Sequence, residues 1–309
     1  MLIQVAVLGG AALDIVIKVN EFPQNDQIVF PLAGPYWMPG GSAANVAVGT
    51  ARLGLKSCFL GKIGDDEQGK QILDAFIKEG VNIKGLITVK NGLTAQSIVV
   101  VNNAGDRIIY SLGGTAIIEK SSELVVELLQ QVQLLYIAEA FEDVALRAIS
   151  MAKGQAMVFY APGGIFSQHG MEKLGAVISQ TDYLLVSQNE LQDLTEQIEM
   201  EASVRALFEL GVKNIIVTAG KKGSLLFSRD GSRVEVPAFE SIPVDTTGAG
   251  DAFAAGFIYS LLMKYQPRHA LSIGNACAAM AIKDMGARSS MPDLTKLKKF
   301  LQEKQVFLR

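Results

Sequence analysis

The sequence predicts an α/β protein with a doubly wound, mainly parallel sheet, helices on both faces and a small β lid. Three observations support this prediction. Short, almost wholly apolar strand candidates recur along the chain, amphipathic helix patterns separate them, and two extended segments interrupt the alternation. The 309 residues, 49% of them hydrophobic, are enough for one large domain with a buried core. We therefore expect a single domain over residues 1–309.

The strand candidates look like strands that are buried on both faces of a parallel sheet. They read VAVLG, LLYIA, MVFYA, YLLVS and NIIVTAG, and each is short and nearly all apolar. Helix patterns lie between them, for example over 67–81 and 142–154, where apolar residues recur at spacings of three and four. Repeated units of this kind predict the doubly wound sheet.

Two segments, 14–37 and 94–112, lack helical periodicity. In the second, IVVVN and IIYSL flank NAGDR, whose Gly105 supplies the turn chemistry of a hairpin. The two extended segments predict a small sheet that forms a lid over the ligand edge of the main sheet, and an ordinary antiparallel extension is the alternative. An exposed lid with apolar residues is a natural dimer surface, so we expect a homodimer.

Charge and hydropathy exclude several classes of protein. Lys and Arg total 28 against 31 Asp and Glu, so no basic surplus favours nucleic acid or an anionic membrane. The apolar N-terminal segment lacks a basic leader, and no apolar run reaches the roughly 18–20 residues that a membrane helix needs. We expect a cytoplasmic protein without nucleic-acid or membrane partners.

The stretch DTTGAGDAF, residues 245–253, predicts an anion site at the start of a helix. Apolar residues after Asp251 are spaced as one helix face, so Gly248, Ala249 and Gly250 stand at the helix N-terminus, where unpaired N–H groups attract anions. In the functional interpretation, Asp251 takes a proton from a hydroxyl while this cradle holds a phosphoryl group. The alternative, a first-turn acid that stabilises the helix by about 0.3–1 kcal/mol, leaves the Gly-Ala-Gly unexplained.

A second glycine-rich segment, PGGSAANVAVGTARLG at 39–54, also runs into an amphipathic helix and carries Asn45 one turn in. Glycines let the backbone approach a ligand, and Asn can donate to and accept from a polyol hydroxyl. Packing of the helix against its strand would explain the small residues equally well.

Together these two segments resemble the paired signatures of the ribokinase-like family, the PfkB carbohydrate kinases. The likeness extends from the strand before Asp14 to GARSSMP near the C-terminus. It implies an ATP-dependent kinase that transfers the γ-phosphoryl group to a hydroxymethyl group of a small sugar of the ribose, fructose or keto-deoxy sugar acid class.

The resemblance also implies roles on the acceptor side. Asp251 would be the catalytic base, with Gly248, Ala249 and Gly250 as the anion hole. The residues that would hold acceptor hydroxyls are Asp14, Gly40, Gly41 and Asn45. Glu139 falls where ribokinases place a sugar-binding glutamate, and a carboxylate there should repel a phosphorylated sugar; a helix-leading acid is the alternative.

On the nucleotide side, the resemblance implies ATP contacts from Thr218, Gly220 and Gly223, with Asn275 either lining the adenine pocket or packing between helices. Lys221 and Lys222 are interpreted as solvated turn residues. The family's N-x-x-E motif, which organises Mg²⁺, has Glu190 at its acid but Ser187 at its asparagine, and Ser can still hydrogen-bond a metal-bound water. A monovalent cation such as K⁺ is implied at Asp245, Thr247, Ala281, Gly286 and Ser290.

Other functions remain open at the level of sequence. GGSAAN differs from the GGKGAN typical of ribokinases, so a nucleoside kinase is the main alternative, with Tyr36, Trp37 and Met38 as candidate platform for a base or as lid packing. From another class, a non-catalytic sugar-binding protein or an NAD-binding dehydrogenase would be rivals. The intact Asp251 argues against the first, and the N-terminal glycines do not fit G-x-G-x-x-G. The P-loop-like GDDEQGKQ lacks the Ser or Thr that meets Mg²⁺.

Overall fold

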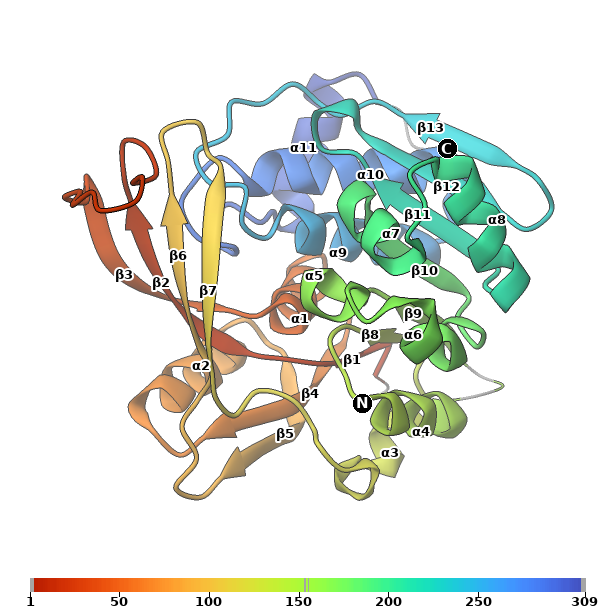
Figure 1. The fold of residues 1–309 in the computed structure, drawn as a ribbon. Coiled ribbons are helices and arrows are strands. Elements are labelled where there is room, and N and C mark those ends of the chain that lie inside the picture. Colours follow the sequence, from red (N-terminus) through yellow and green to blue (C-terminus); the bar gives the residue numbers. More distant parts are fainter. Residues whose placement is uncertain (1–2, 153, 155, 307–309) are drawn as a thin grey trace.

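A nine-stranded sheet forms the centre of the computed structural model, which describes residues 3–152, 154 and 156–306 (Figure 1). The strand order is β13-β12-β11-β10-β9-β8-β1-β4-β5. All neighbouring strands from β11 across to β5 pair in parallel, whereas β12 pairs antiparallel with both β11 and the edge strand β13. The predicted doubly wound, mainly parallel sheet is confirmed. The strands are β1 (Val5–Leu8), β4 (Ser57–Gly64), β5 (Asn82–Val89), β8 (Leu134–Ile137), β9 (Met157–Tyr160), β10 (Tyr183–Ser187), β11 (Asn214–Thr218), β12 (Ser224–Ser228) and β13 (Arg233–Val236).

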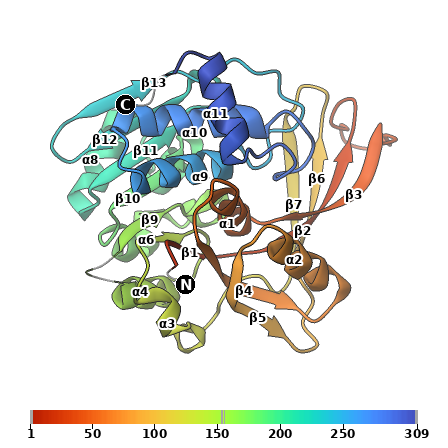
Figure 2. The same cartoon turned by 180° about the vertical axis from the view of Figure 1, so that it is seen from behind.

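Helices cover both faces of this sheet, as Figures 1 and 2 show from opposite sides. One face carries α1 (Ser42–Arg52), α2 (Glu67–Lys78), α9 (Ala249–Leu262), α10 (Pro267–Ala281) and α11 (Leu294–Glu303). The other carries α3 (Val126–Leu129), α4 (Glu142–Ala152), α5 (Gly163–Ser167), α6 (Gly170–Ile178), α7 (Gln188–Thr195) and α8 (Met200–Leu210). Short 3₁₀ turns occur at Ser121–Glu123 and Gly220–Lys222.

The central strands are buried on both sides because their apolar residues alternate between two hydrophobic layers. On β1, Val5 and Val7 pack into the layer of α1 and α9, whereas Ala6 and Leu8 pack into the opposite layer. All four side chains are at most 1% exposed. Burying an aliphatic side chain of this size contributes about 1.5–3 kcal/mol, so the two layers fix the sheet and the helices that it positions.

A second, small sheet lies beside the first and contains both segments that the sequence marks as extended. Its order is β3-β2-β6-β7, with β2 (Ala12–Lys18), β3 (Ala33–Gly40), β6 (Gln96–Val101) and β7 (Arg107–Gly113). Strands β6 and β7 form the expected hairpin, and Gly105 in its turn has a φ of 82°. Strand β2 follows β1 across residues 9–11, so the chain passes directly from the large sheet into the small one.

The register of the small sheet gives its two faces different characters. Asp14 pairs with Met38 and Ser97, so these three side chains share one face, which is turned toward the body of the protein. The pleat places the next residues along, Ile15 with Trp37 and Ile98 with Tyr110, on the opposite, outer face. That outer face is apolar and exposed, with Trp37 54% and Tyr110 57% accessible.

Among the helices in the described ranges, the longest is α10, and none combines the length and the apolar character that crossing a membrane requires.

Candidate active site

Helix α9 begins with a backbone geometry that leaves N–H groups free for an anion. Its N-cap, Gly248, is left-handed with a φ of 79°, and a Cβ there would lie 2.6 Å from the carbonyl oxygen of Ala287, so glycine is required. Within the described residues, no acceptor faces the N–H groups of Gly250 and Asp251. Gly250 is exposed, and the space above its Cα is empty. This helix start has the shape of the predicted anion cradle.

The carboxylate of Asp251 lies where the two glycine-rich segments meet. Ser42 Oγ donates to Asp251 Oδ1 at 2.7 Å, and Asn45 Nδ2 donates to Oδ2 at 2.7 Å, both from the first turns of α1. Burial raises the pKa of Asp251, and these two hydrogen bonds together with the charges of Arg107 and Arg288 offset part of that rise. A held carboxylate with a raised pKa is suited to accept a proton.

Asp14 lies against Gly40, which ends β3 just before the N-terminus of α1. A Cβ on Gly40 would overlap with the Asp14 carboxylate, so glycine permits the close approach. Burial raises the pKa of Asp14 to about 6, and Arg288 and a hydrogen bond from Ser97 limit the rise. The adjacent Gly41 is the N-cap of α1, and its carbonyl accepts from the Asn45 N–H at 2.8 Å.

Glu139 follows the end of β8 and completes a group of three carboxyl side chains. Its pKa rises to about 7, mainly through burial and also through the charges of Asp251 and Glu190. The charge of Asp251 also raises the pKa of Asp14, so Asp251 is close enough to interact with each of the other two acids. The structure therefore brings Asp14, Asn45, Glu139 and Asp251 to one place from four separate parts of the chain.

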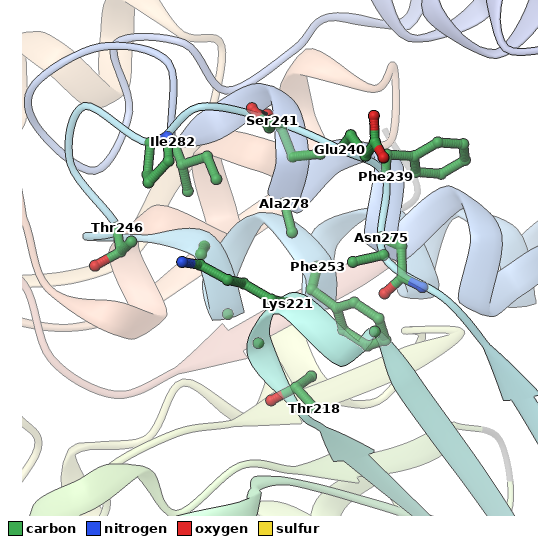
Figure 3. A pocket seen from close by; sticks show the side chains of 17 residues that line it. Thr218, Lys221, Phe239, Glu240, Ser241, Thr246, Phe253, Asn275, Ala278 and Ile282 are labelled. Atoms are coloured by element: carbon green, nitrogen blue, oxygen red, sulfur yellow. Dashed lines mark hydrogen bonds between the residues drawn. The ribbon is translucent and has the colours of Figure 1, made fainter. Parts of the chain in front are cut away.

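A cavity of about 520 Å³ adjoins the N-terminus of α9, and Asp14 is not among the residues that line it (Figure 3). Ala249 and Gly250 form part of its wall, so it reaches the candidate anion cradle. The four predicted ATP-contacting positions Thr218, Gly220, Gly223 and Asn275 all line it, together with apolar side chains that include Phe239, Phe253, Ala278 and Ile282.

Asn275 and Lys221 are polar residues of the cavity wall. Asn275 Nδ2 donates to the carbonyls of Val236 and Pro237, both at 3.1 Å, so its amide also has a packing role. Lys221, interpreted from sequence as a solvated turn residue, lines the cavity and extends its side chain into it (Figure 3). Lys222 does not line it.

Ser187 and Glu190 form a capping box at the N-terminus of α7. Ser187 Oγ accepts from the Glu190 N–H at 3.2 Å, and Glu190 Oε2 accepts from the Ser187 N–H at 2.7 Å. In the part of the chain that the structure describes, no cluster of three or more His, Cys, Asp or Glu could hold a metal by itself. Glu190 Oε1 stays free of hydrogen bonds there, which fits Mg²⁺ held through one carboxylate, waters and substrate phosphates.

Three of the five predicted cation positions meet at the fully buried Asp245. Its Oδ1 accepts from Thr247 N at 2.8 Å and from Thr247 Oγ1 at 2.6 Å, and its Oδ2 accepts from Gly286 N at 2.8 Å. Ala281 ends α10, and the Ser290 hydroxyl donates to Asp284 instead. None of the described Lys, Arg or His side chains forms an ion pair with Asp245.

Sequence reasoning missed three residues around Asp251: Ser42, Arg107 and Arg288. Ser42 stands inside the quoted GGSAAN segment, and Arg288 stands between Gly286 and Ser290 in GARSSMP. Arg107 follows the hairpin turn. The hydrogen bonds of Ser42 and Arg288 join residues 209 and 243 positions apart, so only the fold reveals them.

The candidate aromatic platform for a nucleoside base is divided by the pleat of β3. Tyr36 and Met38 share a face with Asp14, whereas Trp37 lies on the outer face with Ile15. Trp37 is therefore not placed beside Asp14, and only Tyr36 and Met38 remain candidates.

Comparison with known proteins places this geometry among kinases. The model of a family described as pfkB family carbohydrate kinase matches residues 3–294. Fructokinase-2 of Oryza sativa subsp. japonica is 30% identical over 276 residues, which cover 82% of each chain. A nucleoside kinase of Methanocaldococcus jannaschii is 27% identical over 306 residues, 98% of each chain.

Solved structures give the same result. A ribokinase of Thermotoga maritima superimposes with a TM-score of 0.84 at 27% identity, over 98% of this chain and 100% of that one. A ribokinase of Arabidopsis thaliana, complexed with ribose and ATP, superimposes with a TM-score of 0.83 at 25% identity, over 98% and 99%.

Proposed function

Because the chain belongs to the pfkB family of carbohydrate kinases, we propose that it transfers the γ-phosphoryl group of ATP to a hydroxymethyl group of a small sugar. One observation carries this proposal. The carboxylate of Asp251, held by Ser42 and Asn45, stands beside the unpaired N–H groups that begin α9. A base and an anion cradle at adjacent positions are the two groups that phosphoryl transfer needs.

In the proposed step, Asp251 takes the proton of the acceptor hydroxyl as its oxygen attacks the γ-phosphorus. The new O–P bond forms, the bond from the γ-phosphorus to the bridging oxygen breaks, and ADP leaves with that electron pair. The N–H groups of Gly250 and Asp251 face the charge on the transferred phosphoryl oxygens, which is where preorganised donors accelerate a reaction most. Asp14 and Glu139 accept hydrogen bonds from the other acceptor hydroxyls and orient the ring.

ATP would occupy the 520 Å³ cavity, with its γ-phosphate toward Gly250. The apolar wall suits a purine ring, and Lys221 supplies a positive charge for the phosphates. Glu190 would hold Mg²⁺ through a water or directly, and the ion would neutralise charge on the phosphate oxygens. We further propose that Asp245 and the surrounding backbone oxygens hold a monovalent cation beside the cradle, since that buried carboxylate has no cationic partner within the described residues.

An unphosphorylated sugar is the better acceptor, because Asp14, with a pKa of about 6, is mainly ionised at neutral pH and would repel an added phosphate. The similarity to fructokinases and ribokinases favours a ketose or pentose. A nucleoside is the second candidate acceptor, because the nucleoside kinase of M. jannaschii matches over 98% of both chains and Tyr36 shares the face of Asp14.

We also propose that the protein is a homodimer that pairs through the outer face of the small sheet. Trp37, Ile108, Tyr110 and Leu112 are 38–57% exposed there, and large apolar side chains gathered on one face indicate a protein contact. Size-exclusion chromatography with light scattering checks the mass.

A coupled ADP-release assay tests the proposed function. The purified protein is given ATP and Mg²⁺ with ribose, fructose, a keto-deoxy sugar acid and a set of nucleosides, and K⁺ is added or replaced by a bulky organic cation. We expect ADP release that depends on one acceptor class and is abolished in Asp251→Asn. The kinase assignment fails if no acceptor is turned over.

A further inference from the structure

Arg288 is a buried arginine that reaches the candidate active site from the segment after α10. The residue is only 8% exposed. The Nε donates to Asn45 Oδ1 at 2.7 Å, and Nη2 donates to the Gly40 carbonyl at 2.8 Å. Both acceptors belong to the glycine-rich segment that borders Asp14 and Asp251, so one guanidinium contacts both ends of the proposed acceptor site.

The bond to Asn45 determines which end of that amide faces Asp251. An Asn side chain has one carbonyl oxygen and one NH₂ group on opposite sides. Because Oδ1 is engaged by the Arg288 guanidinium, the NH₂ group is the one that points at the Asp251 carboxylate, at 2.7 Å. The flipped amide would present its oxygen to the carboxylate and its NH₂ to a cation, and both contacts would be repulsive.

The surroundings of Arg288 do not explain it as a stabilising ion pair. No carboxylate in the described ranges lies within ion-pair distance of it, and Nη1 is buried without any hydrogen-bond partner. Burial lowers the pKa of Arg288 to about 10, with Asp14 and Asp251 acting in the opposite direction, so the side chain is charged at neutral pH. A buried, incompletely paired charge costs stability, so a purpose other than stability is needed.

The position of the guanidinium is itself fixed. Arg52 Nη1 donates to the Arg288 carbonyl at 2.6 Å and to the Met291 carbonyl at 2.9 Å, which holds the backbone of this segment against α1. The guanidinium also lies 5.6 Å from the ring centroid of Phe76. Both constraints limit the rotation of the Arg288 side chain. A group that orients another side chain must itself be held in one orientation.

We propose that Arg288 is a positioning residue for phosphoryl transfer, which locks the Asn45 amide in the orientation that donates to Asp251. The bond to the Gly40 carbonyl helps to hold the guanidinium in place for this role. This rests on the proposed role of Asp251 as the base. Arg288 touches neither ATP nor the reacting atoms, and it acts on the rate through Asn45.

A double-mutant cycle between Arg288 and Asn45 tests this. Arg288→Met keeps the length and apolar stem of the side chain, and Asn45→Ala removes the amide. We expect each single variant to lower kcat by about 10- to 100-fold, as expected for losing a hydrogen bond to a charged group, while KM for ATP stays unchanged. The double variant should be no slower than Asn45→Ala alone, because without the amide Arg288 has nothing to orient.

Arg233→Met is the control, since it removes a guanidinium on β13 that contacts Glu201 and Glu235 and neither Arg288 nor Asn45. It should keep kcat within about twofold, and its effect should add to that of Asn45→Ala in free-energy terms. If Arg288→Met does not fold, Arg288→Lys replaces it in the same cycle. Lysine keeps the charge and one donor group, so its kcat should fall by less than the loss expected when the bond to Asn45 is absent.

Two results would overturn the proposal: multiplicative kcat losses in the double variant, or an Arg233→Met variant as slow as Arg288→Met. Failure of the proposed function has a different signature, because Asp251→Asn would then retain its rate. A slow Asp251→Asn with an unaffected Arg288→Met would reject only the positioning role.

Discussion

The amide of Asn45 donates a 2.7 Å hydrogen bond to the carboxylate of Asp251, which lies 206 residues away in the sequence. With Ser42 on the other oxygen, the acid is held at both ends by helix α1. The proposed base is therefore tied to the glycine-rich segment at 39–54 by two hydrogen bonds, and several consequences can be measured.

Asp251→Asn should lower kcat by at least about 10²–10⁴-fold, because the amide cannot accept the acceptor's proton. The substitution is nearly isosteric, so the fold and the affinity for ATP should be kept. ADP release gives the rate, and calorimetric titration with a non-hydrolysable ATP analogue gives the affinity. Loss of nucleotide binding in step with the rate would contradict a role as base.

Gly250→Ala and Gly248→Ala should have opposite effects on stability. A Cβ on Gly250 meets no atom, so alanine should keep or raise helix stability by up to about 1 kcal/mol while it obstructs the anion cradle and lowers kcat. At Gly248, with its φ of 79° and the nearby Ala287, alanine should destabilise the fold by about 1–2 kcal/mol. Urea unfolding and ADP release on both variants check this. A Gly250→Ala enzyme with full activity would show that the cradle holds no phosphoryl group.

Glu139→Gln should reduce the pH dependence of stability. The pKa of Glu139 rises from 4.5 to about 7 in the folded protein, so the fold favours the protonated acid. The contribution of protonated Glu139 to the free energy of unfolding is complete below about pH 4.5 and is lost as pH rises through about 7. The melting temperature should therefore change less between pH 5 and pH 8 in Glu139→Gln than in the wild-type protein. The exposed Glu142→Gln is the control and should leave the difference unchanged.

Lys221→Ala should raise KM for ATP by about two- to fivefold and leave KM for the acceptor unchanged, because an exposed charge in the cavity wall contributes modestly. The adjacent Lys222→Ala is the matched control, since that residue does not line the cavity. Initial rates over a range of ATP concentrations distinguish the two. Equal changes in KM for ATP in the two variants would indicate that only the net charge of the turn matters.

Tyr110→Glu should convert the proposed dimer into a monomer without unfolding it, because a charge on the apolar outer face cannot be buried against a second copy. Light scattering gives the mass. Ile198→Glu, at a position 87% exposed and outside the small sheet, should leave the mass unchanged. A wild-type protein that is monomeric at all accessible concentrations would refute the dimer.

The sequence predicts five of the nine strands of the large sheet, β1, β8, β9, β10 and β11, because stretches such as VAVL and LLYI are short and apolar on both faces, as strands inside a parallel sheet are. It predicts the hairpin through Gly105 but not the parallel pairing of β2 with β6, since pairing of strands so distant in sequence depends on their alignment in space. It identifies Asp251 and Asn45 through their glycine-rich contexts.

Arg288 shows why other parts of the site escape prediction. A single arginine in a loop has no periodicity or local partner that reveals where its guanidinium points, and both of its acceptors lie more than 240 residues away. The candidate role of Trp37 in a platform for a base is ruled out for a related reason. Neighbouring residues on a strand face opposite ways, so three adjacent candidates could not share one pocket.

The route of the chain limits how the small sheet can move against the body. Asp14 belongs to the small sheet, whereas Asp251 and Glu139 belong to the body, and the chain passes between the two at residues 9–11, at Gly41, at 90–95 and at 114–120. A swing of the small sheet would withdraw Asp14 from the other two acids only if these four connections bent together. Admission of a sugar and release of the product would then depend on one concerted motion.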